Sequence, residues 1–470
     1  MKVRDDIALL RSAGFARPNV VPRGIQLPNK NVFKARTGEE RGRRSRIEVD
    51  FGVLELNWQV LNGKVTSTSG VREVGVDNAT DFDGSQFSYF NQSIAFDQQQ
   101  FSQELVYASD YDGRINFTAG AYYFKQDYTH SEGRNLSLGA TQTVTRAHLD
   151  QESYAGFGEA DIKLADRWTL TLGGRYTEET KKAKTVPFTP VATLCADRSI
   201  YGFDDCRFPY GPTGEHTWSD FSPKVVLGFK PSEEHLVYGS VTRGFRSGGY
   251  SLRGNQLFNP FDSEEVTAYE TGYKGQLFDN RVRLNAAVYV NKYQDLQRTV
   301  LGVDAQFGVV QSTFNVADAT IQGLEFDVVA QATDHLVLTL GYGYTDAKYD
   351  SAVVGFNKNA DFVRVPENSG SFSASYDFDL APGILTLRAG ATYTDSEFFN
   401  DANTVGEPSY TLVDGSIDFK SAGGQWTASL FGKNLTEEEY AYWGSTLGAL
   451  GANSFRGAPR TFGVRLGYDF

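Results

Sequence analysis

Apolar and polar side chains alternate at every second position along almost the whole chain. From Trp168 to Tyr176, apolar or aromatic residues interleave with threonine, glycine and arginine, and segments 282–290, 371–378 and 385–393 repeat the pattern. Since successive side chains of a β-strand point to opposite sides of a sheet, each segment has one apolar face and one polar face. The chain is therefore predicted to be all-β and to contain many such strands.

The lengths of the connections distinguish a membrane barrel from a soluble sandwich. Short turns rich in Gly, Asn, Asp and Pro are expected at 62–63, 112–113, 165–167, 231–233, 279–280, 333–334, 381–383 and 422–424. Long connections alternate with them, near 75–98, 129–151, 185–218, 247–263, 301–310, 351–363, 397–407 and 435–459. This alternation places short turns on one rim and long, extracellular loops on the other, which a Greek-key sandwich does not do. We therefore predict a transmembrane, antiparallel, up-and-down β-barrel with lipid outside and a polar lumen.

The composition agrees with a bilayer crossed by strands rather than by helices. The 470 residues include 48 Gly, 25 Tyr and 34 Phe, and the mean hydropathy is -0.38. No apolar run approaches the roughly 18 to 20 residues of a transmembrane helix. Barrel strands keep the average hydropathy low because their lumen-facing side chains are polar. About 17 to 18 strands are expected, and complete bacterial single-chain barrels have an even number.

Charge and the first residues bear on partners and domain boundaries. The net charge of -13 argues against a nucleic-acid partner. Residues 51–470 are expected to form one barrel domain, because no linker divides them. Residues 1–50 are interpreted either as a remnant of an upstream strand with an extracellular loop or as a non-native terminus. They begin without the apolar region of a signal peptide, so an exported protein is expected to have more sequence upstream.

The two cysteines, Cys195 and Cys206, lie in one long polar connection. A disulfide that closes this loop is expected, with a stabilisation on the order of 3 kcal/mol in an oxidising compartment. A metal site is the weaker alternative, because His216 is the one histidine nearby and the spacing fits no zinc pattern. We predict neither a metal nor a cofactor.

The last strand carries a specific signal. One face holds an alternating apolar and aromatic series that ends on the final residue: Phe462, Val464, Leu466, Tyr468 and Phe470. This series resembles the C-terminal signal that the barrel-assembly machinery reads. The machinery and outer-membrane lipid are therefore expected partners.

Several motifs resemble the TonB-dependent receptor and transporter family. Near the C-terminus they are KNLT at 433–436, GAPRTFG at 457–463 and GYDF at 467–470. Further upstream they are FSQEL at 101–105, GAYYF at 120–124, GGRYTE at 173–178, RGFRSGG at 243–249 and YETGYK at 269–274. The similarity covers roughly residues 50 to 470.

This resemblance implies a barrel of roughly 22 strands whose lumen holds an N-terminal plug. Residues 1–50 contain no segment similar to the plug or to the TonB box. The chain is thus expected to be an incomplete barrel, monomeric, that reaches the TonB complex only through the missing plug segment.

Aromatic and cationic residues near the long loops are the candidates for ligand contact. They are Tyr201, Phe203, Tyr210 and Trp443 in loops, and Arg243, Arg246 and Tyr250 at the lumen. Aromatic rings can grip a flat or sugar-like ligand, and arginines can attract an anionic ferric chelate. Two alternatives stay open: the aromatics form the membrane girdle or pack the loops, and the arginines pair with lumen acids.

Histidine placement argues against an enzyme. His130, His148 and His216 are predicted in extracellular loops, and His235 and His335 at periplasmic turns, so none is expected in a walled catalytic site. A hydrolase is accordingly disfavoured.

The favoured function is TonB-energised uptake of a scarce large ligand, with a ferric siderophore favoured by the resemblance over cobalamin or an oligosaccharide. The alternative is a passive porin, a class whose barrels have about 16 to 18 strands.

Overall fold

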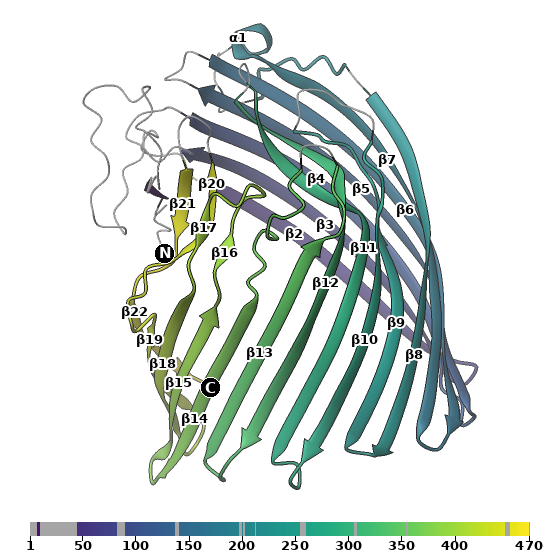
Figure 1. The fold of residues 1–470 in the computed structure, drawn as a ribbon, viewed down its shortest axis with the longest axis vertical. Helices are drawn as coiled ribbons and strands as arrows, with labels where there is room; N and C mark the ends of the chain where they lie inside the picture. Colours follow the sequence, from purple (N-terminus) through teal and green to yellow (C-terminus); the bar gives the residue numbers. More distant parts are fainter. Residues whose placement is uncertain are drawn as a thin grey trace.

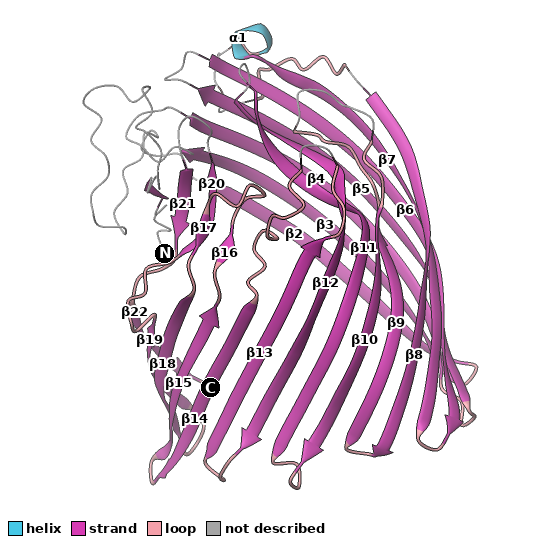
Figure 2. Cartoon of the chain, in the orientation of Figure 1, coloured by secondary structure: helices cyan, strands magenta, loops and turns pink. Residues whose placement is uncertain are grey.

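A computed structural model describes residues 7–9, 45–81, 90–136, 141–196, 200, 203–211, 213–253, 260–304, 308–353, 356–446 and 452–469. Seventeen of its strands form one large antiparallel sheet that curves into a barrel (Figure 1). The predicted all-β architecture is confirmed. Within the described residues, the only helix is α1 (Val191–Leu194), which is much too short to traverse a membrane (Figure 2).

The barrel strands follow one another in sequence, and each pairs with the next. They are β2 (Arg46–Val60), β3 (Gly63–Asp81), β4 (Phe90–Ser109), β5 (Ile115–Leu136), β6 (Thr141–Ala165), β7 (Trp168–Pro190), β8 (Thr213–Ser232), β9 (His235–Arg246), β10 (Glu264–Leu277), β11 (Val282–Asp304), β12 (Gly308–Gln331), β13 (Leu336–Tyr349), β14 (Asn368–Leu380), β15 (Gly383–Thr394), β18 (Tyr410–Ser421), β19 (Trp426–Lys433) and β22 (Thr461–Tyr468). Registers join every successive pair from β2 to β22.

Two small sheets lie at the rim where the long connections are. β1 (Ile7–Leu9) pairs with β21 (Ala452–Arg456), which also pairs with β20 (Ala441–Thr446). β16 (Glu397–Phe398) and β17 (Gly406–Glu407) form a two-stranded sheet. At the opposite rim, the connections in the described part of the chain are short turns. In the first of them Leu61 and Asn62 both have positive φ, as the twist of a tight hairpin requires.

The two faces of the sheet differ as the alternation predicts. Large apolar side chains such as Phe372, Leu387 and Ile417 remain exposed on the outer face. Exposed apolar surface on this scale is unfavourable in water and favourable in lipid. The inner face of the same strands carries polar residues, among them Ser371 and Arg388. The sheet therefore has a lipid face and a wet face.

Buried apolar residues gather at the long-loop rim rather than at mid-barrel. One cluster joins Leu296, Val316, Ala317, Ala319, Tyr349 and Phe362. A second surrounds Val144 and Val191, and a third surrounds Ala147 and Leu252. This distribution means that connections and strand ends, rather than the lumen, provide the packed core.

Several connections expected to be long loops are instead extensions of strands. β5 continues to Leu136 and β6 begins at Thr141, so the segment expected as a loop at 129–151 is mostly a hairpin. β3, β4, β7, β11 and β12 extend in the same way. The placement of His130, His148 and His216 in loops was therefore wrong, because all three lie within strands β5, β6 and β8. Cross-strand pairing satisfies backbone groups that a loop would leave to water.

Candidate ligand-binding surface of the lumen

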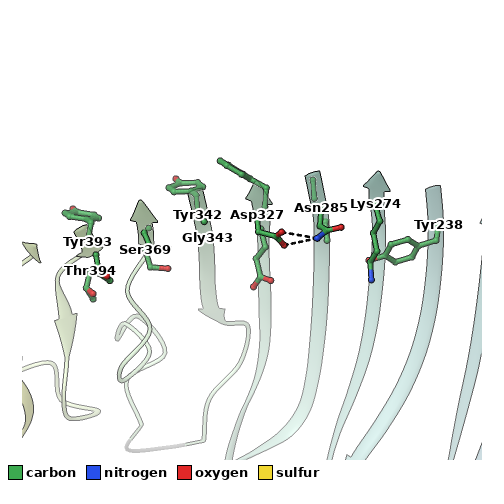
Figure 3. Close-up of a pocket in the computed structure, with 17 residues that line it drawn as sticks. Tyr238, Lys274, Asn285, Asp327, Tyr342, Gly343, Ser369, Tyr393 and Thr394 are labelled. Carbon is green, nitrogen blue, oxygen red and sulfur yellow. Dashed lines mark hydrogen bonds between the residues drawn. The ribbon is translucent and has the colours of Figure 1, made fainter. Parts of the chain in front are cut away.

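A row of polar side chains crosses the inner wall of the barrel. Strand registers place Lys274 opposite Asn285, Asn285 opposite Asp327, and Asp327 opposite Gly341. The row continues through Ser371 to Thr392. Because each step is a direct cross-strand pair, all these residues lie on the same face of the sheet. Figure 3 shows this wall, with the labelled side chains on neighbouring strands.

A shallow concavity of about 520 Å³ lies along this row. The Asn285 amide donates hydrogen bonds to both carboxylate oxygens of Asp327, at 3.2 and 2.9 Å. Lys274 places its ammonium 5.7 Å from the centre of the Tyr238 ring, and the Tyr238 hydroxyl donates to Glu270 at 2.5 Å. These groups can bind polar surfaces or water.

The two arginines predicted at the lumen differ in their partners. Arg243 lies 2.6 Å from Glu265 and 3.1 Å from Asp220, whose side chain is almost fully buried. Arg243 therefore pairs with acids, which is the alternative that the sequence left open. Arg246 is exposed at the end of β9, and no carboxylate pairs with it among the described residues. Arg246 is thus the better placed of the two to meet an anion.

Residues 247–253, which we call the mouth segment, cross the inside of the barrel at the long-loop rim. On one side Lys181 donates hydrogen bonds to the Ser247 hydroxyl and the Gly248 carbonyl, at 2.8 and 2.6 Å. On the other side the backbone of Thr313 donates to the Ser251 hydroxyl at 2.8 Å. The segment therefore ties β7 to β12.

Tyr250, a predicted ligand contact, belongs to this segment. Its ring packs edge-on against Trp218, with centroids 6.4 Å apart, and lies beside the cluster of Ala147 and Leu252. Much of the Tyr250 side chain is therefore engaged in packing within the mouth.

A buried charged cluster anchors the mouth segment. It was not predicted from the sequence. The fully buried Glu132 accepts hydrogen bonds from Arg134 at 2.6 Å and Arg253 at 2.9 Å, and from Gln92. Although burial opposes ionisation, the His130 hydrogen bond and the two arginine charges hold the pKa of Glu132 well below its usual range. Residues 132 and 134 are two positions apart on one strand. That spacing is too common in strands to identify such a cluster from sequence.

Comparison with known proteins identifies the architecture. A family model described as TonB-dependent receptor-like β-barrel matches residues 4–435. The chain belongs to this family. The family consists of receptors and transporters rather than enzymes, and its barrels lie in the outer membrane of Gram-negative bacteria. The long-loop rim of this receptor barrel is therefore extracellular.

Individual relatives are similar at low identity. The ferrioxamine receptor of Yersinia enterocolitica is 27% identical over 401 residues, which cover 80% of this chain and 48% of that protein. The ferric-pyoverdine receptor PbuA of Pseudomonas sp. strain M114 is 26% identical over 340 residues, covering 69% and 36%. The chain spans about half the length of such curated relatives, or less.

Solved structures agree on the fold. The ferric yersiniabactin uptake receptor FyuA of Yersinia pestis superposes with a TM-score of 0.76 at 17% identity, covering 91% of this chain and 62% of that one. The siderophore receptor PiuA of Acinetobacter baumannii gives a TM-score of 0.70 at 18% identity, covering 90% and 64%.

The aromatic loop candidates of the receptor barrel have diverse environments. Phe203 is buried in the cluster of Val144 and Val191, which favours a packing role. Tyr210 is partly exposed, and the Lys184 ammonium lies 4.9 Å from its ring centre. Trp443 packs edge-on against Phe455 at 5.0 Å. Tyr201 lies outside the described residues.

The cysteines lie in the connection between β7 and β8. The sulfurs of Cys195 and Cys206 are bonded, and α1 precedes the first of them. The loop is held against the barrel wall, because the Ser93 hydroxyl donates to the Ile200 carbonyl and the Arg146 guanidinium lies 4.1 Å from the Phe208 ring. The disulfide thus closes a loop that covers neighbouring strand ends.

The C-terminal strand exposes the series that resembles an assembly signal. Phe462, Val464 and Leu466 are each at least two-thirds exposed, and Tyr468 is less so. Phe470 lies outside the described residues. The exposed side chains share the outer face of β22 and are available to lipid or to another protein.

Proposed function

We propose that this chain is the barrel portion of an outer-membrane receptor that imports a ferric siderophore with energy delivered by the TonB complex. The polar row from Lys274 to Thr392 carries the proposal, because it lines the inside of a wall whose outer face is apolar. An iron chelate moving through such a lumen stays in contact with hydrogen-bonding groups rather than hydrocarbon. The names of relatives that bind ferrioxamine and ferric pyoverdine support the ligand class.

In this proposal the extracellular mouth captures the ligand. Arg246 supplies a cation without a carboxylate partner among the described residues, and Tyr210 and Trp443 supply partly exposed rings. The reaction consists of binding and translocation, with no bond made or broken. Coupling to TonB requires the plug region that the family resemblance implies. The series at 462–470 directs insertion by the assembly machinery into outer-membrane lipid as a monomer.

Uptake of labelled iron tests the proposal. The whole receptor that contains this chain is expressed in a host lacking its own siderophore receptors, and ferric hydroxamate, catecholate and carboxylate chelates are supplied separately. We expect saturable uptake of one chelate class, abolished when TonB is deleted. A passive porin predicts TonB-independent influx of small sugars at rates proportional to concentration, and that result would replace the receptor by the porin.

A further inference from the structure

Three metal-ligating side chains meet on the outer wall of the barrel, away from the lumen. Registers between β5 and β6 run without a shift from Ile115 to Leu136, so the side of each residue is known from alternation. Ile115 and Phe117 are exposed on the lipid face, and Asp127 lies on the same face further up β5. On β6 the exposed Tyr154 shares its face with Asp150 and His148.

The height of these residues follows from the aromatic pair below them. Tyr123 and Tyr154 face each other with centroids 5.0 Å apart, and aromatic girdles mark the membrane interface in such barrels. Lys125 and Glu152 form the next cross-strand pair, 3.2 Å apart. The pair Asp127 and Asp150 follows, at or above the level of lipid headgroups.

The pairing of Asp127 with Asp150 is unfavourable by itself. The two carboxylates occupy directly opposed positions on adjacent strands, where like charges destabilise a sheet. Neighbouring lysines are engaged elsewhere: Lys182 lies 3.0 Å from Glu215, and Lys184 lies over the Tyr210 ring. A further cation between the carboxylates would remove the repulsion.

His148 completes a ligand set of one nitrogen and two oxygens. Its Nε2 lies 3.1 Å from an Asp127 oxygen and 3.4 Å from an Asp150 oxygen, and all three atoms lie within 4.8 Å of one another. Two ligands of a tetrahedral zinc ion, each at about 2.1 Å from the metal, are about 3.4 Å apart. The Thr129 hydroxyl, 3.1 Å from Nδ1, orients the ring, as partners of metal-bound histidines do.

We propose that Asp127, His148 and Asp150 bind a divalent transition-metal ion, such as Zn²⁺, on the outer wall of the barrel. The carboxylates are about half exposed and the imidazole is mostly buried, so an ion can enter from the side facing away from the lumen. Water completes the coordination. The site is separate from the lumen and does not depend on the proposed transport function.

Metal titration of the purified chain in detergent tests the site. Zn²⁺ is added in competition with a chromogenic chelator, and we expect one ion bound per chain. His148→Ala and Asp127→Asn should each weaken binding by more than about tenfold, and Thr129→Val by about tenfold. His335→Ala is the matched control, because its imidazole lies 3.8 Å from the Asp379 carboxylate on the opposite rim and no third metal-ligating side chain joins them among the described residues. Equal affinity of wild type and His148→Ala, or an equal loss in the control, would overturn the proposal.

A second measurement covers the case in which a variant fails to fold. Co²⁺ added to the wild-type chain should produce the visible absorption of a tetrahedral nitrogen and oxygen site, reversed by excess Zn²⁺. Absence of that absorption at saturating Co²⁺ would contradict the proposal. A simple ion pair of protonated His148 with the two carboxylates predicts neither the spectrum nor stoichiometric Zn²⁺.

Discussion

The barrel has a tall wall and a short wall, and they are stabilised differently. The tall wall, β4 to β8, has strands of 20 to 25 residues, whereas β13, β14, β15 and β18, the short wall, have 12 to 14. A bilayer requires about 9 to 11 residues per strand. The short wall thus does little more than cross the membrane, and Figure 1 shows β5, β6 and β7 rising beyond it.

The difference between the two walls indicates which part of the barrel determines ligand specificity. Beyond the membrane the tall wall buries Glu132 and Arg134, carries the disulfide-closed loop and holds the mouth segment through Lys181. The polar row of the lumen runs from β10 to β15, and its end at Ser371 and Thr392 lies on the short wall. Interactions that distinguish one receptor from another are expected on the tall wall, while the short wall depends on lipid.

The largest effect is expected from Glu132→Gln. The substitution leaves the charges of Arg134 and Arg253 without their buried partner, so the free energy of unfolding of the tall wall should fall by about 3 to 5 kcal/mol. Chemical denaturation monitored by tall-wall tryptophan fluorescence measures this. Glu215→Gln removes a pair that is more than half exposed and should cost less than about 1 kcal/mol. Equal losses would remove the distinction between the buried and exposed pairs.

Acid should reveal the same cluster. The pKa of Glu132 is lowered on folding, so its contribution is complete above the unfolded pKa of about 4.3 and is lost as pH falls toward the lower folded pKa. Wild type should therefore lose more tall-wall stability than Glu132→Gln between pH 5 and acidic pH. Parallel pH profiles for the two proteins would contradict this assignment.

The short wall should respond most to a charge on its lipid face. Leu387→Arg places a guanidinium among Tyr376 and Ile417 and should destabilise the barrel by about 2 to 4 kcal/mol if the site lies near the bilayer midplane. Ser371→Arg, on the wet face of β14, should be nearly neutral. Unfolding in lipid vesicles measures both, and a larger loss for Ser371→Arg would invert the assignment of the faces.

Loss of the disulfide should have a smaller and local effect. Replacing Cys195 and Cys206 by serine should reduce stability by about 2 to 3 kcal/mol, because the short loop gains freedom in the unfolded chain. Limited proteolysis should then cut within residues 191–211 sooner than in wild type. Unchanged cleavage would mean that packing of the loop against the wall is sufficient.

The smallest effect should separate the two arginines. Arg246→Ala is expected to weaken chelate binding by about tenfold, equivalent to about 1.4 kcal/mol, with barrel stability unchanged. Arg243→Ala should instead lower stability, because it leaves the buried Asp220 without its partner. Chelate binding and thermal unfolding are measured for both variants. Loss of stability in Arg246→Ala together with loss of chelate binding in Arg243→Ala would contradict the prediction.

Much of the fold follows from local patterns along the chain. Period-two alternation predicted the faces of β7, β11, β14 and β15, and the turn residues predicted the short rim. Side-chain direction in a strand depends only on position parity, so these features need no knowledge of distant contacts. The confirmed family and outer-membrane location follow from the same strands and motifs.

Only the tertiary structure decided which contacts form where the strands extend beyond the membrane. Parity along β5 and β6 does not reveal that Glu132 meets Arg253, more than a hundred residues away, or that Ser251 reaches Thr313. It also does not show that residues expected in loops continue as paired strands. Those outcomes depend on which strand ends lie side by side and on how connections fold back over them, and such long-range contacts leave no periodic trace in the sequence.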